Sequence, residues 1–297
     1  RIAVYYNSTN WSIAQILQTN AAAISDNSFI NYGSSIFIDM DDNEAVIPNG
    51  VTIQENYTDD GINYNKPEVR WDTGLTGFNF SRLVIANAHI NASIPINITV
   101  PVILLNNTRW YGIEMNVENS EFNVSGSSIS MKNFTINSPK VNITLNSNLS
   151  GANYLVINSS LADVSLNSRL YSYNITITAD SSYIDASSKL DGTGWGYPYW
   201  SGPGYRDFSG NAYVGHGGIG TNSQTSGSRG RVYDSVYQPH MAGSSGNTRG
   251  GGIVRIHSND LILNGNITTD GSGGGSAGSV LITSNVFNGT GRISAYG

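Results

Sequence analysis

Fifteen Asn-x-Ser/Thr triplets occur in this chain, and in a secreted protein each such triplet can accept an N-linked glycan. The number is about twice what the contents of Asn, Ser and Thr would give by chance. An attached glycan requires a position that faces solvent. The enrichment therefore predicts a glycosylated protein outside the cell. The acceptor residues are Asn7, Asn10, Asn56, Asn79, Asn91, Asn97, Asn106, Asn123, Asn133, Asn142, Asn148, Asn158, Asn174, Asn266 and Asn288.

Many of these triplets lie within strand-like sequence. Successive side chains of a strand point to opposite faces, so Asn97 and Thr99 share one face while Ile96, Ile98 and Val100 take the other. The same pattern recurs at residues 141–145 and 173–177. A simpler interpretation is that half-buried strands merely use Asn and Thr on their polar face. We favour glycan acceptors because Asn is usually depleted from strands.

The densest acidic cluster consists of Asp39, Asp41, Asp42 and Glu44, whose oxygen ligands would suit Ca²⁺. The spacing begins like an EF-hand loop but then fails, since Glu44 stands where that loop needs Gly. We therefore favour a solvated turn over a Ca²⁺ site. Apart from N-linked glycans, we expect no cofactor.

Histidine and cysteine give little sign of a metal centre. His89, His216, His240 and His257 lack the spacing of metal ligands, although His216 and His240 fall in the same Gly-rich stretch and could share a site. We favour structural roles for them. The absence of Cys excludes disulfides and thiol chemistry.

Two patterns could indicate catalysis. The segment 274–278 matches Gly-x-Ser-x-Gly, but no helix follows it and no His lies downstream to complete a hydrolase triad, so we interpret it as a turn. Asp180, Asp185 and Asp191, followed by Arg206 and Asp207, leave a polysaccharide lyase or hydrolase open as an alternative.

Aromatic residues crowd the Gly-rich stretch. They could pack on the flank of the fold, form a protein interface, or stack on sugar rings. No acceptor triplet occurs between Asn174 and Asn266, which suggests a face that stays free of sugar for contacts with other copies. The candidates are Trp195, Tyr197, Tyr199, Trp200, Tyr205, Phe208 and Tyr213.

Composition narrows the class of protein. Charged residues make up only 12%, and the net charge of −6 argues against nucleic acid as a partner. No apolar run reaches the length of a membrane span. Because the chain opens at Arg1 and ends within repeat-like sequence, we expect it to be a segment of a longer exported precursor.

The order of elements predicts an all-β solenoid. Residues 12–24 carry the one helical pattern, and residues 28–80 resemble strands separated by turns, so residues 1–80 are expected to form an N-terminal cap or small subdomain. Residues 81–190 contain very short strands without helical sequence, which favours stacked coils over a sandwich of two sheets. Coils are expected throughout 81–297, interrupted by a Gly- and aromatic-rich excursion at 191–252.

The closing third carries a series of Gly-rich pieces. They include Leu190-Asp191-Gly192-Thr193-Gly194, Gly215-His216-Gly217-Gly218, Gly250-Gly251-Gly252-Ile253-Val254, Leu263-Asn264-Gly265-Asn266-Ile267 and Gly273-Gly274-Gly275-Ser276-Ala277-Gly278. Residues 190–297 thereby resemble the glycine-rich, parallel β-helix proteins of large secreted and surface proteins. The resemblance implies a right-handed β-helix in an adhesin-like or structural protein and supplies no catalytic site. The acceptor triplets and the aromatic residues near Trp195 depart from that pattern.

Glycine has two expected roles in this part of the chain. At Asp-Gly corners it would supply a positive φ for tight turns, and in Gly runs it would let two backbones approach closely.

The sequence thus favours a non-enzymatic, N-glycosylated extracellular protein that builds a cell-surface layer, an appendage or a filament. The open ends of a solenoid favour self-association into a polymer. The lack of Cys and the scarcity of Lys suit an archaeal surface. A carbohydrate-active enzyme and a sugar-binding adhesin remain as alternatives.

Overall fold

The computed structural model describes residues 95–208, 211–217 and 230–297, and within residues 1–94 only the strands named below. Every element in these residues is a β-strand. Twenty of the strands join one sheet system in which the pairing is parallel except between β4 and β5. The prediction of an all-β, solenoid-like fold is confirmed at this level.

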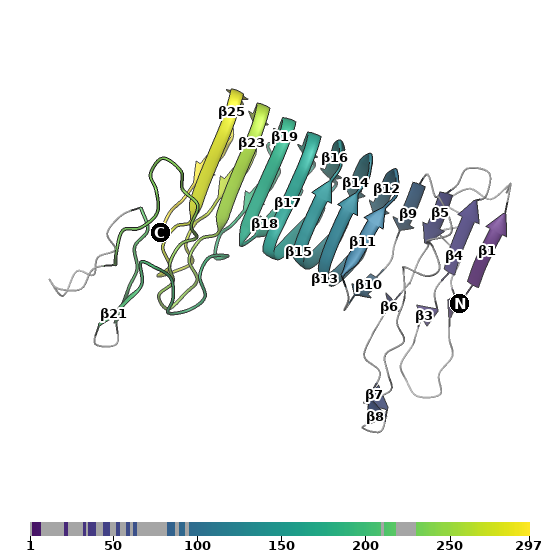
Figure 1. Cartoon of the computed structure of the whole chain (residues 1–297), viewed down its shortest axis with the longest axis horizontal. Coiled ribbons are helices and arrows are strands. Elements are labelled where there is room, and N and C mark those ends of the chain that lie inside the picture. The colour runs from purple at the N-terminus through teal and green to yellow at the C-terminus, as the bar shows by residue number, and fades with distance from the viewer. Residues whose placement is uncertain are drawn as a thin grey trace.

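The strands form three parallel stacks, and the chain visits each stack once per coil. The first face runs through β9 (Arg82–Ala86), β12 (Val102–Asn106), β14 (Glu121–Ser125), β16 (Lys140–Thr144) and the closing parts of β17 (Asn148–Val164), β19 (Asn174–Ile184), β23 (Ile253–Leu263) and β25 (Ser279–Asn288). In Figure 1 these strands lie side by side along the length of the molecule.

Two further faces complete each coil. The second face runs through β6 (Thr52–Ile53), β10 (His89–Ala92), the opening parts of β13 (Arg109–Glu118), β15 (Ser128–Asn137) and β17, then β18 (Arg169–Ser172), β20 (Lys189–Asp191), β24 (Asn266–Thr268) and β26 (Arg292–Ser294). The third face runs through β11 (Ile96–Thr99), the later parts of β13, β15 and β17, and the opening parts of β19, β23 and β25.

The coils repeat closely in length. Val102 pairs with Glu121, Glu121 with Lys140, Lys140 with Leu161 and Leu161 with Ser181, so partners are 19 to 21 residues apart. This constancy keeps each inward position above an inward position of the preceding coil. The stacked coils therefore share one core.

The core is built from alternating side chains. In β14 and β16 every second residue is buried, and the largest fully buried side chains include Trp110, Phe122 and Phe134. The rings of Phe122 and Phe134 meet edge to face with their centroids 6.4 Å apart. Burial of these rings and of the aliphatic side chains stacked with them is the main stabilising contribution of the coils.

A column of buried hydroxyl groups lines the corner between the first and second faces. The backbone N–H of Thr108 donates to Ser127 Oγ at 2.9 Å, and the N–H groups of Ser127, Ser147 and Ser168 donate in turn to the hydroxyls of Ser147, Ser168 and Ser188. We call this column the corner ladder. It satisfies backbone groups that would otherwise be buried without partners at the bend.

Backbone in the left-handed region makes the bends beside the corner ladder. Leu145 and Asn146 have φ values of 54° and 61°, and Leu166 and Asn167 have values of 54° and 63°. Both leucines are exposed. The left-handed conformation costs an L-residue roughly 1–2 kcal/mol, and Asn tolerates it better than Leu.

The expectation that Gly provides the positive φ at Asp-Gly corners is wrong at the two Asp-Gly pairs that the structure describes. Gly192 and Gly271 do not adopt a positive φ. Instead, an added Cβ on Gly271 would lie 2.0 Å from the carbonyl oxygen of Gly275. These two glycines therefore serve close approach rather than backbone reversal.

Replacing Leu166 with Asn is expected to raise the free energy of unfolding by about 0.5–1 kcal/mol, since it relieves the left-handed leucine. Thermal and denaturant unfolding would measure the change. Leu161→Asn is the matched control. Leu161 is also exposed, but it lies inside the strand β17, where it pairs with Ser181 of β19. That variant should lose stability. A loss of similar size in both variants would contradict the argument.

The excursion interrupts one coil between β20 and β23. It contains the hairpin of β21 (Arg206–Phe208) and β22 (Asn211–Tyr213), which Figure 1 shows projecting beside the last coils. The register nevertheless resumes without a shift, since Asn174 pairs with Ile253 and Ile184 with Leu263. The inserted segment thus leaves the stacking of coils unchanged.

The N-terminal strands extend the first face. β1 (Ile2–Tyr6) pairs in parallel with β4 (Ser35–Asp39), β4 pairs antiparallel with β5 (Glu44–Ile47), and β5 pairs in parallel with β9. β4 and β1 therefore run opposite to the strands from β5 onward. The division at residue 80 into a cap and a β-helix stays a prediction.

Short hairpins complete this region. β7 (Thr58–Asp59) and β8 (Ile62–Asn63) form the hairpin that the Asp-Gly sequence between them predicts. Part of the predicted helix over 12–24 is wrong, because Ala21–Ala22 form β2 and pair with β3 (Tyr32–Gly33). Helix propensity is a weak preference that strand pairing can override. The other residues of that predicted helix lie outside the described residues.

Candidate functional site

The acceptor asparagines lie on the outer surface wherever their side chains are described. Five are exposed and five are half-buried. Asn91 belongs to β10, and Asn7, Asn10, Asn56 and Asn79 lie outside the described residues. Glycosylation itself stays a prediction. The exposed group is Asn97, Asn106, Asn158, Asn266 and Asn288, and the half-buried group is Asn123, Asn133, Asn142, Asn148 and Asn174.

Asparagine side chains stack on one another from coil to coil. Asn142 Nδ2 donates to Asn123 Oδ1 at 2.6 Å, and Asn116 Nδ2 donates to Asn97 Oδ1 at 3.0 Å. Similar bonds join the side chains of Asn153 to Asn133 and of Asn158 to Asn137. Neighbouring strands lie about 4.8 Å apart, so these columns satisfy the amides without help from sugar. We call them the asparagine ladders.

Asn123 and Asn142 should not carry glycans on the same molecule. The two acceptors are direct partners across β14 and β16, and two sugars attached about 4.8 Å apart would collide. Mass spectrometry of a glycopeptide spanning residues 121–144 would show at most one glycan. Asn97 and Asn174 provide the comparison, since they belong to coils far apart in the stack. Frequent double occupancy at Asn123 and Asn142 would contradict the prediction.

Three triplets contain a hydroxyl that the fold uses directly. Thr108 lies in the corner ladder, Ser150 is buried with its Oγ 3.5 Å from the carbonyl oxygen of Ile129, and Thr268 Oγ1 donates to Asp191 Oδ1 at 2.9 Å. The fold itself therefore accounts for the hydroxyl residue in the triplets of Asn106, Asn148 and Asn266. The simpler interpretation of the pattern therefore explains part of the enrichment.

Asp191 anchors the start of the excursion. Its side chain is 2% exposed, forms ion pairs with Arg169 and Lys189, and accepts hydrogen bonds from Thr193 N–H and Thr268 Oγ1. Burial opposes the charge, but the bonds from Lys189, Thr193 and Thr268 together lower the pKa of Asp191 to about 2. The carboxylate therefore stabilises the point where the chain leaves the coil.

Asp234 is a second buried carboxylate, and it binds several residues in the later part of the excursion. Its Oδ1 lies 2.7 Å from His240 Nδ1, and its Oδ2 lies 3.3 Å from His216 Nε2. Ser279 Oγ donates to Oδ2 at 3.1 Å, which ties the excursion to β25. Burial opposes the charge here too, but backbone N–H groups, among them those of Met241 and His240, hold the pKa of Asp234 below its usual range.

The two histidines of the Gly-rich stretch are therefore brought together, and the sequence had left this shared position open as a possibility. They meet through Asp234, whose role sequence reasoning missed. His216 also places Nδ1 2.7 Å from the carbonyl oxygen of Ala277 and stacks on the ring of Tyr233. These contacts are structural. In the part of the chain that the structure describes, no group of three or more His, Cys, Asp or Glu could hold a metal ion.

The aromatic residues of the excursion fall into two groups. Trp195 packs on Tyr171 with ring centroids 5.6 Å apart, and Tyr197 meets Tyr173 at 6.4 Å, so these two fasten the excursion to the coils. Tyr171 also lies under the Arg169 guanidinium, 5.2 Å from ring centroid to Cζ.

The second aromatic group faces solvent. Tyr199 and Trp200 are exposed, and Trp200 meets the ring of Tyr205 at 6.2 Å while holding φ at 57°. Phe208 and Tyr213 belong to the β21–β22 hairpin, and nothing further is described of their side chains. Two residues that the sequence did not single out, Val236 and Tyr237, are 90% and 92% exposed.

The loop that carries Val236 and Tyr237 is fixed in place. Asp234 accepts from the N–H groups of Ser235, His240 and Met241, and Ser235 Oγ accepts from those of Tyr237 and Gln238. A rigid loop that displays two apolar side chains is suited to contact another molecule.

The carboxylates that could have formed a catalytic site are each engaged separately. Asp191 is neutralised by basic side chains, whereas Asp185 accepts from Leu166 N–H and Ser187 Oγ. Asp180 Oδ1 accepts from Asn259 Nδ2. Burial raises the pKa of Asp163, and the charge of Asp185 adds to this effect. Arg206 and Asp207 lie in β21.

The remaining sequence candidates are the acidic cluster and the Gly-x-Ser-x-Gly match. Asp39 and Glu44 are partners at the end of the β4–β5 hairpin, while Asp41 and Asp42 lie outside the described residues. Ser276 of the Gly-x-Ser-x-Gly match is buried, and its Oγ donates to the carbonyl oxygen of Ser244 at 3.1 Å. This hydroxyl serves the packing of the excursion.

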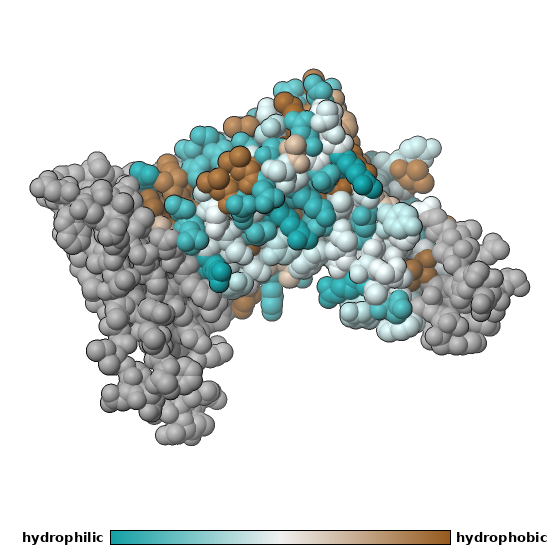
Figure 2. All heavy atoms as spheres, turned by 180° about the vertical axis from the view of Figure 1, so that it is seen from behind, coloured by the Kyte–Doolittle hydropathy of each residue, from teal (hydrophilic) through white to brown (hydrophobic). Residues whose placement is uncertain are grey.

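No protein-family model, curated protein or solved structure matches this chain. Among the residues described, no helix has the length and apolar character needed to cross a membrane. On the face seen in Figure 2, hydrophilic residues cover much of the solenoid flank and hydrophobic residues lie in small separate patches.

Proposed function

We propose that this chain is an N-glycosylated extracellular structural protein, a subunit of a cell-surface layer, appendage or filament. In this proposal the coils form a right-handed parallel β-helix with an N-terminal cap. The surface is that of an archaeal cell. The subunits associate with one another.

The observation that carries the proposal is the placement of acceptor asparagines along the outside of stacked coils. Asn97, Asn123, Asn133 and Asn174 are each followed by a buried apolar residue of the core. An outer surface rich in amides and hydroxyls and poor in charge can be covered with sugar without disturbing the packing beneath it. A long solenoid with such a coat suits a structural role at a cell boundary.

Native material provides the test. Glycopeptide mass spectrometry should find sugar at several of the outward acceptors, and electron microscopy of the cell surface should show ordered polymers or a layer. Native protein that carried no glycan and remained dispersed would contradict the proposal.

A sugar-binding adhesin is the second candidate, and the exposed pair Tyr199 and Trp200 favours it. A backbone bond from Trp200 N–H to the carbonyl oxygen of Gly246 and a bond from Ser201 Oγ to that of Pro198 hold the turn that displays both rings. Aromatic faces held in this way can stack on sugar rings. Glycan-array binding that Trp200→Ala abolishes would support this function, and an array without any bound glycan would remove it.

A further inference from the structure

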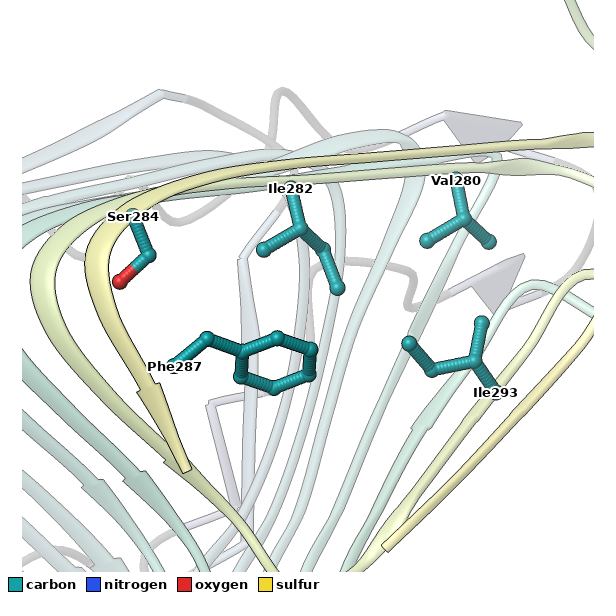
Figure 3. A pocket seen from close by; sticks show the side chains of 5 residues that line it. All are labelled: Val280, Ile282, Ser284, Phe287 and Ile293. Carbon is teal, nitrogen blue, oxygen red and sulfur yellow. The ribbon is translucent and has the colours of Figure 1, made fainter. Parts of the chain in front are cut away.

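The apolar hollow between β25 and β26 offers no group that could respond to its surroundings. Figure 3 shows Val280 and Ile282 facing Phe287 and Ile293 across it, and Ser284 is the one polar residue that lines it. None of these side chains carries a charge or gains one at ordinary pH. The titratable groups that the excursion buries are the better candidates for such a response.

His216 lies between two oxygen atoms that can only accept hydrogen bonds. Its Nδ1 is 2.7 Å from the carbonyl oxygen of Ala277, and its Nε2 is 3.3 Å from Oδ2 of Asp234. Although burial opposes its charge, backbone N–H groups hold the pKa of Asp234 below its usual range, so this carboxylate has no proton to donate. Both ring nitrogens of His216 must therefore donate, which requires the doubly protonated, positively charged form of the ring.

The surroundings of this ring suit a buried positive charge. The side chain of His216 is 8% exposed and that of Asp234 is 3% exposed, so the imidazolium and the carboxylate form a pair shielded from water. The rings of His216 and Tyr233 lie with their centroids 4.5 Å apart, and an aromatic face attracts a cation. Burial raises the pKa of Tyr233, which keeps its hydroxyl group neutral.

The neighbouring titratable and charged groups do not share this requirement. His240 is 63% exposed, and its Nδ1 lies 2.7 Å from Asp234 Oδ1 and 3.1 Å from the carbonyl oxygen of Gln238, so a single N–H serves both acceptors. From β23, Arg255 Nη2 donates to the carbonyl oxygen of His240 at 2.9 Å. Of the two histidines that the structure describes in the excursion, only His216 needs a second proton to satisfy its contacts.

The ring of His216 joins a surface loop to the coils. We call residues 234–241 the display loop, because they carry the two exposed apolar side chains that lie beyond Asp234. Asp234 closes this loop by accepting from backbone N–H groups at its far end. On its other side the ring contacts Ala277, two residues before β25. The display loop is therefore tied to the coils through a ring whose two contacts require two protons.

We propose that His216 is a pH-dependent clasp, which in its doubly protonated form holds the display loop against the coils and which releases the loop as the pH rises. A neutral ring carries one N–H, so its other nitrogen points a lone pair at an acceptor oxygen and one of the two contacts is lost. Free histidine makes this change at about pH 6.5. The stabilisation is therefore present at acidic pH and is lost in alkaline solution. The clasp depends neither on glycosylation nor on polymer formation.

NMR spectroscopy of the chain with isotope-labelled histidine tests the protonation directly. The chain has four histidines, and replacing each in turn assigns its signals. At about pH 7 both ring nitrogens of His216 should carry a proton, although free histidine is mostly neutral at that pH. A His216 ring with one unprotonated nitrogen at about pH 7 would overturn the proposal.

Chymotrypsin cleavage after Tyr237, the exposed aromatic residue of the display loop, measures how often the loop opens. Each variant is compared with the wild type at the same pH, which cancels the pH dependence of the protease. His216→Phe keeps an aromatic ring beside Tyr233 but has no N–H to donate. It should be cleaved at least about tenfold faster than the wild type at about pH 6, and this factor should fall toward one at about pH 9. A factor that stayed constant would show that the ring only fills space.

Two further variants assign the effect to one histidine. His257 lies in β23 and pairs with Thr178 and Thr283 of the neighbouring coils, so His257→Phe should match the wild type at both pH values. His240→Gln should keep the pH dependence of the wild type, because it leaves the contacts of His216 in place. Loss of the pH dependence in His240→Gln but not in His216→Phe would overturn the assignment. Circular dichroism verifies that all three variants retain the coils.

Discussion

Gly251→Ala is expected to detach the excursion from the solenoid. A Cβ at this position would lie 1.8 Å from the carbonyl oxygen of Thr269 and 2.5 Å from the backbone nitrogen of Gly278. The backbone cannot move aside without losing the bonds from Gly251 N–H to Ser276 and from Gly243 N–H to Gly251. Forcing an added methyl group into such a contact costs at least about 1–3 kcal/mol.

Limited proteolysis within residues 192–252 would measure the detachment. Cleavage should become at least about tenfold faster in Gly251→Ala, since opening would be favoured by about 1.4 kcal/mol or more. The solenoid coils should keep their circular dichroism spectrum. Gly217→Ala is the control, because an added Cβ there meets no atom within 4 Å. Equal cleavage rates in the two variants would show that the close approach does not hold the excursion.

Asp191→Asn is expected to lower the free energy of unfolding by about 2–3 kcal/mol at pH 7. The pKa of this buried carboxyl lies at about 2 in the folded chain against a usual value of 3.8, a difference of about two units, and each unit corresponds to about 1.4 kcal/mol. The neutral amide loses the ion pairs with Arg169 and Lys189 but keeps the size of the side chain.

The effect should depend on pH in a defined direction. Because the folded pKa is depressed, the stabilisation is complete above about pH 4 and is lost as the pH falls toward 2. Denaturant unfolding of the wild type and the variant should therefore differ at pH 7 and converge near pH 2. The exposed Asp180 provides the comparison, as Asp180→Asn should differ little from the wild type at either pH. A gap at Asp191 that stayed constant with pH would contradict the electrostatic explanation.

Short alternating strands made much of the solenoid predictable from sequence. Ile96 and Ile98 are buried while Asn97 and Thr99 are exposed, as the period of two requires. Val141, Ile143, Leu155 and Ile157 lie in the core for the same reason. The pattern does not show where a strand ends. The apolar alternation continues from Val164 to Leu166, but β17 stops at Val164 and Leu166 forms a left-handed bend.

The anchors of the excursion were beyond sequence reasoning because they join distant segments. Asp234 binds Ser279, 45 residues away, and Thr193 meets Thr268, 75 residues away. No local period relates such pairs. The corner ladder is different, because its hydroxyl residues recur with the spacing of one coil. Comparing the chain with itself at a shift of 19 to 21 residues would have revealed it.

Glycine shows why residue type alone does not predict the local backbone conformation. Its two possible roles, positive φ and close approach, require the same residue, and the sequence does not distinguish them. The structure assigns close approach to Gly251 and Gly278 and gives a left-handed bend to Leu166 instead.

The direction of the strands also determines how the molecule would respond to tension. Strands cross the long axis, so the hydrogen bonds between coils lie along it (Figure 1). Traction applied to the two ends would break these bonds one coil at a time rather than shear a whole sheet at once. A coil of 19 to 21 residues would release roughly 65 Å of chain as it opened. A cell boundary made of such molecules would yield by stepwise lengthening and could recover its shape when the coils wound again.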